Sequence, residues 1–157
     1  MAIKKEIELK NKKANFEYHI IQSYEAGIIL SGTEVKSVRN AKANINEAYC
    51  TFDKKGELWI KNMHISEYEL GSYFNHEPRR ERKLLLNRSE LLKLHRRVME
   101  KGYTIVPLRV YFSERGIVKI EIALATGKKS FDKRHSIRDK DQNREEKRME
   151  KHSKHFY

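Results

Sequence analysis

Two neighbouring stretches of this chain alternate apolar and polar residues with a period of two, and this pattern constrains the fold more than any other feature. The second stretch is the more regular, with apolar residues at Val118, Ile120, Ile122 and Leu124. In the first, we expect one face to carry Thr104, Val106, Leu108, Val110 and Phe112. Such alternation is typical of half-buried β-strands, and the segment 113–116 between them has the composition of a hairpin turn. We therefore expect an antiparallel pair, in which Pro107 marks a sheet edge or a bulge.

Other segments indicate further strands and two helices. Short strand signals lie at 18–21, 27–30, 48–52, 58–65 and 83–86, with a hairpin turn expected at 53–56. A short helix is expected from a cap at Thr33 to Arg39. A longer helix is expected at 89–101, with Asn87 and Glu90 as a capping box and Gly102 after its end. About six short strands separated by turns favour a small barrel, mainly β with accessory helices, over a layered α/β fold.

The charge of the chain points to a polyanionic partner. Among 157 residues, 34 Lys and Arg stand against 22 Asp and Glu, a formal net charge of +12. Such a balance fits nucleic acid or an anionic membrane surface. No apolar run is long enough to span a bilayer, and the charged segment 1–13 is not followed by the apolar stretch of a secretory signal. We expect a basic protein that is soluble and intracellular.

The charge and the apolar residues are distributed unevenly between two regions. Residues 1–126 hold nearly all the large apolar side chains, whereas residues 127–157 hold 11 basic and 6 acidic residues. The second region buries too little apolar surface to offset the entropy of ordering it. We therefore predict a folded domain at 1–126 and a basic tail at 127–157 that is disordered when free and folds on a partner.

Side chains that could support catalysis do not form a recognisable constellation. The single cysteine, Cys50, lies in an apolar run where packing is its ordinary role, and it excludes a disulfide framework. His152 and His155 have no further ligands around them in the sequence, and no phosphate-binding glycine motif is present. We expect no enzyme, no metal and no cofactor. The alternative from the enzyme class is a nuclease or hydrolase that uses His76, Glu77 and Glu81.

Basic residues interleaved with aromatic ones favour a nucleic-acid partner. Cations cluster at Lys10, Lys12 and Lys13, at Arg79, Arg80, Arg82 and Lys83, along the helix 89–101 and through the tail. Aromatic residues lie close by at Phe16, Tyr18, Tyr24, Tyr68, Tyr73, Phe74 and Phe131. Cations neutralise phosphates and exposed rings stack on unpaired bases, as single-stranded or folded RNA requires. A general ribosomal or RNA-chaperone protein, binding mainly by charge, is the second hypothesis; a membrane-surface role for the tail is less favoured, because 139–151 lacks an apolar face.

Several strings of the sequence, taken in order, resemble one family. They are Asn11-Lys12-Lys13-Ala14, Tyr24-Glu25-Ala26-Gly27-Ile28, Gly32-Thr33-Glu34-Val35-Lys36-Ser37-Val38-Arg39, Arg82-Lys83-Leu84-Leu85-Leu86, Lys101-Gly102-Tyr103-Thr104-Ile105-Val106-Pro107 and Gly127-Lys128-Lys129-Ser130-Phe131-Asp132-Lys133-Arg134. Together they resemble the small protein B (SmpB) family, the bacterial partners of transfer-messenger RNA. The resemblance covers about residues 9–138.

The resemblance implies an OB-like closed β-barrel with a basic tail, and a non-enzymatic role in rescuing stalled ribosomes by trans-translation. Family members bind the tRNA-like domain of transfer-messenger RNA and stand in for its missing anticodon arm in the A site. The resemblance also implies elongation factor Tu and alanyl-tRNA synthetase as partners through the charged RNA, and a cytoplasmic location without a membrane. The tail is implied to enter the empty message channel of the small subunit and fold there as a helix.

The matching motifs also imply site residues. Asn11, Glu25 and Leu85 correspond to positions on the face that binds transfer-messenger RNA. Asn11 and Glu25 can bond to ribose, base edges or a neighbouring lysine, while Leu85 packs either on an exposed base or in the core. The tail motif implied to act at the decoding centre comprises Gly127, Lys128, Lys129, Phe131, Asp132, Lys133 and Arg134.

Overall fold

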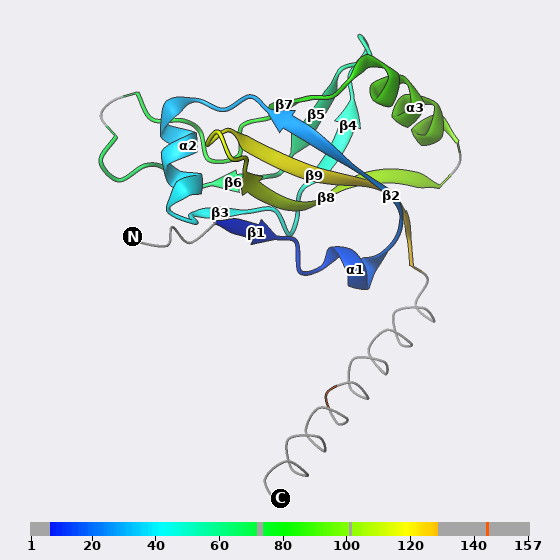
Figure 1. The fold of residues 1–157 in the computed structure, drawn as a ribbon, viewed down its shortest axis with the longest axis horizontal. Helices are drawn as coiled ribbons and strands as arrows, with labels where there is room; N and C mark the ends of the chain where they lie inside the picture. Colours follow the sequence, from blue (N-terminus) through cyan, green and yellow to red (C-terminus); the bar gives the residue numbers. More distant parts are fainter. Residues whose placement is uncertain (1–6, 72–73, 101, 129–143, 145–157) are drawn as a thin grey trace, which may run out of the picture.

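The computed structural model describes residues 7–71, 74–100, 102–128 and 144, and within them it contains nine strands and three helices (Figure 1). The strands are β1 (Glu8–Lys10), β2 (Tyr18–Ile28), β3 (Ala43–Asn44), β4 (Tyr49–Phe52), β5 (Leu58–Lys61), β6 (His64–Ile65), β7 (Arg82–Leu85), β8 (Tyr103–Phe112) and β9 (Val118–Gly127). The helices are α1 (Ala14–Glu17), α2 (Gly32–Arg39) and α3 (Arg88–Met99). No helix in these ranges is long and apolar enough to cross a membrane. The mainly β fold class is as the sequence predicted.

The pairings of the larger sheet close into a ring. Its strand order is β1-β8-β4-β5-β7-β2-β9, every neighbouring pair is antiparallel, and β9 pairs back with β8. Strand β1 lies outside this ring, on the same edge of β8 that meets β4. Strands β3 and β6 form a separate two-stranded sheet.

The interior of the ring holds the hydrophobic core. The four alternating residues of β9 that the sequence predicted to share a face are all buried there, and the strands opposite contribute Leu58, Ile60 and Leu84. The turn at 113–116 forms as expected, with Gly116 at a φ of 78° and its N–H 2.8 Å from the Ser113 carbonyl oxygen. Closing a sheet in this way leaves few unpaired strand edges, which stabilises it against pairing with other chains.

Strand β8 differs from its predicted alternation because a bulge interrupts it. Its register against β9 shifts between Pro107 and Arg109. Residues on either side of the shift therefore change faces: Ile105 and Val110 both lie in the core cluster, although one has an odd and the other an even number. The expectation of one face from Thr104 to Phe112 was wrong. The expectation that Pro107 marks a bulge is confirmed.

Two other strand predictions needed correction. The segment 18–21 and the first two residues of 27–30 are parts of one strand, β2, which ends at Ile28 and stays paired with β9 through a bulge between Ile20 and Gln22. The expected strand at 58–65 is divided into β5 and β6 by Asn62, whose φ of 62° turns the chain. Asparagine tolerates this left-handed conformation better than most residues.

Helices α2 and α3 lie close to their predicted ranges, but their caps differ. The N-cap of α2 is Ser31 rather than Thr33, and its backbone N–H donates to the Glu34 carboxylate at 2.9 Å. Asn87 does cap α3, but its side chain makes no capping hydrogen bond. Leu94 of α3 is fully buried in the core, and Gly102, with a φ of 93°, follows its end.

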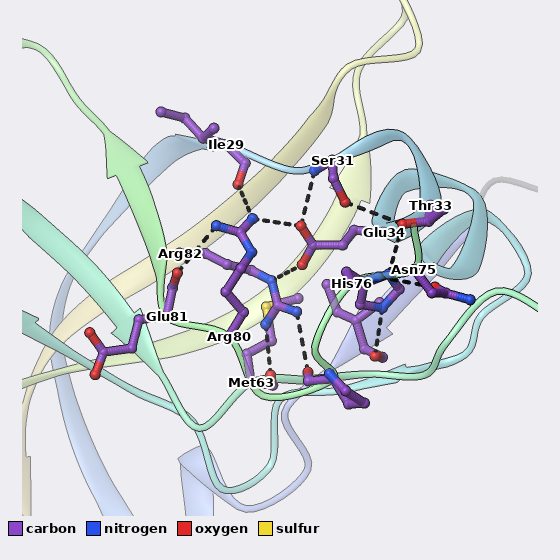
Figure 2. Close-up of polar contacts among 12 residues, drawn as sticks. Ile29, Ser31, Thr33, Glu34, Met63, Asn75, His76, Arg80, Glu81 and Arg82 are labelled. Atoms are coloured by element: carbon purple, nitrogen blue, oxygen red, sulfur yellow. Dashed lines mark hydrogen bonds and ion pairs between the residues drawn. The ribbon is translucent and has the colours of Figure 1, made fainter. Parts of the chain in front are cut away.

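A buried ion pair joins α2 to the first residue of β7 (Figure 2). Glu34 and Arg82 are both fully buried, and the Arg82 guanidinium donates to the Glu34 carboxylate. Arg80 donates to the same carboxylate at 2.5 Å, and Arg82 also donates to the carbonyl oxygens of Met63 at 2.8 Å and Pro78 at 3.2 Å. Burial opposes ionisation of Glu34, but the bonds from Ser31, Arg80 and Arg82 outweigh it and hold its pKa below the ordinary value of 4.5.

We predict that Arg82→Met lowers the free energy of unfolding by about 3 kcal/mol, because it leaves a buried carboxylate short of its main partner. Arg79→Met, which removes a guanidinium bonded at the surface to Asn62, should cost less than about 0.5 kcal/mol. Urea unfolding of both variants measures the difference, and equal stabilities would contradict the assignment.

The same pair predicts a pH dependence. The pKa of Glu34 is lower in the folded chain than in the unfolded one, so the stability contributed by its ionisation is complete above about pH 4.5. That contribution is lost as the pH falls through the folded pKa. We expect the unfolding free energy of Glu34→Gln to fall less steeply with acid below pH 4.5 than that of the unaltered chain.

Candidate nucleic-acid interface

Charged and polar side chains line up across the outer face of the ring. Because Val118, Ile120, Ile122 and Leu124 point into the core, Lys119 and Glu121 of β9 point outward. Across the strand pairings, Glu121 lies between Glu25 of β2 and Arg109 of β8. Two residues before Glu121 on β9, Lys119 lies between Gly27 of β2 and Tyr111 of β8. This outward surface carries one of the residues that the sequence singled out, Glu25.

Glu25 is exposed but is held in place by its neighbours. The Tyr111 hydroxyl donates to the Glu25 carboxylate, and the Arg109 guanidinium lies 4.3 Å from the centroid of the Tyr111 ring. Arg109 also donates to Glu121 at 2.7 Å and to Glu8 at 3.2 Å, and these bonds raise its pKa. Partial burial and the bond to Glu25 raise the pKa of Tyr111 to about 12, so the phenol stays protonated and remains a donor.

Leu85 and Glu25 lie on the same hollow of the surface, which has a volume of about 460 Å³. Gly27 forms part of its lining, and a β-carbon at that position would lie 3.4 Å from the Leu85 β-carbon. Leu86, Asn87, Glu90 and Lys119 complete the lining. Leu85 is 49% exposed, so of the two readings the sequence left open, it points outward rather than into the core.

Asn11 lies elsewhere and is used internally. Its side-chain N–H donates to the Pro107 carbonyl oxygen at 2.8 Å, and its side-chain oxygen accepts from the Lys13 backbone N–H at 3.1 Å. Its own backbone N–H donates to the Leu108 carbonyl oxygen at 2.8 Å. With 9% of its surface exposed, Asn11 fixes the chain that leads into α1 to the bulge in β8. Asn11 lines a different hollow of about 220 Å³, together with residues of α1 and the segment 46–49, and neither Glu25 nor Leu85 lines it.

Lys128 follows β9 directly, belongs to the predicted tail and contacts α1. The Lys128 backbone N–H donates to the Glu17 carbonyl oxygen at 2.8 Å, and its ammonium donates to the Asn15 carbonyl oxygen at 2.7 Å. Gly127 ends β9, paired with Tyr18. The other predicted tail residues, Lys129, Phe131, Asp132, Lys133 and Arg134, lie outside the described residues.

The side chains considered for catalysis, His76 and Cys50, have structural roles. His76 is buried, with one ring nitrogen 2.9 Å from the Thr33 hydroxyl and the other 2.9 Å from the Ile65 carbonyl oxygen (Figure 2). These contacts fix the loop between β6 and β7 and leave neither nitrogen directed at Glu77 or Glu81 for acid–base work. Cys50 is buried, and burial raises the pKa of its thiol, which is the environment of a packing residue.

Sequence reasoning missed Tyr111, Arg109 and Lys119 as neighbours of Glu25. The alternation in β9 already placed Lys119 and Glu121 outward, so that part was readable. The predicted face that includes Val110 likewise left Arg109 and Tyr111 on the outward side of β8. Their contacts with each other and with Glu25 could not be predicted, because they depend on β2 pairing with the other edge of β9.

Together, a ring of antiparallel strands, a net charge of +12 and a polar outer face beside an exposed leucine are the features of a small basic protein of the mainly β class whose charge suits a nucleic-acid partner. The model of the SmpB protein family matches residues 8–152, so the chain belongs to the SmpB family. That match extends past residue 138, where the resemblance in the sequence motifs was expected to end.

Known relatives agree with this assignment. The chain is 57% identical over 147 residues to the SsrA-binding protein of Cytophaga hutchinsonii, a match that covers 94% of this chain and 95% of that protein. It is 53% identical over 135 residues to the SsrA-binding protein of Desulforamulus reducens, covering 86% of this chain and 83% of that protein. A solved structure described as "tmRNA-SmpB: a journey to the center of the bacterial ribosome" has 46% identity and a TM-score of 0.68, covering 84% of this chain and 95% of that one.

We predict that Asn11→Ala lowers the free energy of unfolding by about 1–3 kcal/mol, because the Pro107 carbonyl and the Lys13 N–H lose a buried partner. Glu25→Gln serves as the matched control; it alters an exposed side chain and should change stability by less than about 0.5 kcal/mol. Thermal unfolding of both variants checks this. An Asn11→Ala variant as stable as the unaltered chain would show that Asn11 contributes only through a surface contact.

Proposed function

We propose that this chain is the RNA-binding adaptor of trans-translation. It binds the tRNA-like domain of transfer-messenger RNA, takes the place of the missing anticodon arm, and brings that RNA to the A site of stalled ribosomes. There the broken message is replaced and the nascent peptide is tagged for degradation. The observation that carries the proposal is membership of the SmpB family over nearly the whole chain, with relatives named SsrA-binding proteins. As a member of this family the chain is an RNA-binding protein and not an enzyme.

The finer fold assignment belongs to the same proposal. We assign residues 1–126 to an OB-like closed barrel, supported by the ring of β8, β4, β5, β7, β2 and β9 and by the β8–β9 pairing that closes it. Residues 127–157 form a separate basic tail that is disordered when free and becomes helical in the message channel. The small apolar content of the tail supports this division.

The hollow beside Glu25 and Leu85 is the proposed site for transfer-messenger RNA. A carboxylate repels phosphate, so Glu25 must accept from base or sugar donors, and the Tyr111 hydroxyl keeps it aligned for that purpose. Leu85 offers an exposed apolar surface on which an unpaired base can pack, and Lys119 on the opposite side attracts the RNA backbone. Asn11 contributes indirectly, because both ends of its side chain are bonded within the protein.

The remaining partners follow from the adaptor role. The tail residues Gly127, Lys128, Lys129, Phe131, Asp132, Lys133 and Arg134 act at the decoding centre and in the message channel of the small subunit. Elongation factor Tu and alanyl-tRNA synthetase meet the complex through the charged RNA. Such a cycle takes place in the cytoplasm.

Deletion of residues 127–157 tests the division of labour. We expect affinity for the tRNA-like domain to stay within about twofold, because the site on the ring is intact, while peptide tagging on ribosomes stalled without a stop codon is abolished. Gel-shift titration and an in vitro tagging assay measure the two quantities separately. Loss of both together would mean that the tail is part of the primary RNA site.

Tyr111→Phe tests the proposed RNA site itself. Removing one hydroxyl frees Glu25, and we expect affinity for the tRNA-like domain to fall roughly three- to tenfold, the value of one lost hydrogen bond. The slope of affinity against salt should not change, because no cation is removed. Tyr103→Phe, on the same strand beneath Arg97, is the matched control and should bind normally.

The same titrations separate the adaptor from a general RNA-chaperone protein. Binding by charge alone gives equal affinities for the tRNA-like domain and an unrelated RNA at raised salt, and leaves Tyr111→Phe unaffected. The adaptor retains a preference for the tRNA-like domain at raised salt, and Tyr111→Phe reduces that preference.

A further inference from the structure

We infer that Lys128 is an intramolecular latch: its contacts with α1 set the direction in which the tail leaves the folded domain. This assignment rests on the proposed function, because it gives a different task to one residue of the tail motif. In that motif a lysine would ordinarily be read as a cation for ribosomal phosphates. Here its ammonium donates to a carbonyl of the same chain.

The geometry that carries the inference consists of two bonds from one residue. The Lys128 backbone N–H donates to the Glu17 carbonyl oxygen at 2.8 Å, and its ammonium donates to the Asn15 carbonyl oxygen at 2.7 Å. Both acceptors belong to α1. Lys128 and Asn15 are 113 positions apart in the sequence. Two bonds to one short helix fix both the position of the backbone and the direction of the side chain.

These bonds act just beyond the last strand pair. The β2–β9 ladder ends at the pair Tyr18 and Gly127, and the bond from the Lys128 backbone N–H to the Glu17 carbonyl oxygen continues it by one residue onto α1. Gly127 has no side chain that could fix the direction of the chain, and nothing lies within 4 Å of the place a β-carbon would take there. Beyond that backbone bond, the Lys128 ammonium adds a second restraint, because it donates to the Asn15 carbonyl oxygen.

The helix that holds Lys128 is itself anchored to the ring. The Asn11 side chain ties the residues before α1 to Pro107 and to the Lys13 N–H. The Lys12 backbone N–H donates to the Asn46 side chain at 3.0 Å, and the Lys13 ammonium pairs with Glu47. A continuous set of contacts thus runs from the bulge in β8 through Asn11 and α1 to Lys128. A change in α1 should alter the direction of the tail without altering the hollow beside Glu25.

The benefit of such a latch is a smaller loss of entropy when the tail enters a narrow channel. A tail that leaves in many directions must give up this freedom on binding, whereas one that leaves in a fixed direction has given up part of it already. The latch thus affects how efficiently a bound complex proceeds to tagging. It leaves the affinity for transfer-messenger RNA unchanged.

The experiment compares three variants of the full chain: Lys128→Met, Lys128→Arg and, as matched control, Lys129→Met. The first removes the ammonium, the second keeps a cationic donor that reaches the Asn15 carbonyl, and the third removes the same charge from the adjacent position. Two readouts are used: tagging by ribosomes stalled in a purified translation system, and the spread of distances between spin labels at Lys54→Cys and Ser130→Cys. Cys50 is buried and does not take up label.

We expect Lys128→Met to broaden the label distances and to reduce tagging roughly three- to tenfold at unchanged affinity for the tRNA-like domain. Lys128→Arg should restore both readouts, and Lys129→Met should leave the distance spread unchanged. The inference is overturned if Lys128→Met leaves the distances as they were, or if Lys128→Arg fails to restore tagging. If even the unaltered chain supports no tagging, the proposed function fails, while the label distances still decide whether the latch exists.

Discussion

The pairing between β8 and β9 is the constraint on which the other features of the structure depend. It closes the ring, so every strand of the ring has two fixed neighbours and the outward residues are ordered in rows across the sheet. The turn at 113–116 starts this pairing in the register that sets Arg109 and Tyr111 opposite Glu121 and Lys119 on the outside, and the bulge at Pro107 shifts the register beyond Arg109. The same bulge provides the carbonyl that holds Asn11. One ladder thus positions both the hollow beside Glu25 and the helix that contacts the tail.

The net positive charge of the chain contrasts with the carboxylates on the outer face of the ring. A chain with a net charge of +12 attracts any RNA, yet its outer face presents Glu25, Glu121 and Glu90 near the exposed Leu85. Carboxylates at that place repel phosphate and can accept hydrogen bonds from base or sugar donors. Under the proposed function, cations elsewhere would attract the RNA at long range, and the hollow beside Glu25 would select the partner at short range. The buried pair of Glu34 and Arg82 has a different task, since it holds α2 and the start of β7 together.

Patterning of apolar residues predicted the class of fold and most strands, because the period of two survives wherever a strand faces the core on one side. It failed where a local irregularity changes the period: at the bulge in β8, at Asn62, and along β2, whose middle residues are outward and polar. Motif resemblance pointed to Glu25 and Leu85, which do share a hollow. It could not reveal that Asn11 is buried, because burial of a polar side chain depends on a partner 96 residues away in sequence, the Pro107 carbonyl.

The burial of Cys50 has a consequence for how the protein withstands oxidants. Its sulfur is the only thiol in the chain; it is shielded in the core and kept as a neutral sulfhydryl, so peroxides and electrophiles have no reactive thiolate to attack. Among the described methionines, Met63 is equally hidden, whereas Met99 is 75% exposed at the end of α3. Chemical damage in a stressed bacterium should therefore begin as a thioether lesion on the surface, away from the core that holds the ring closed.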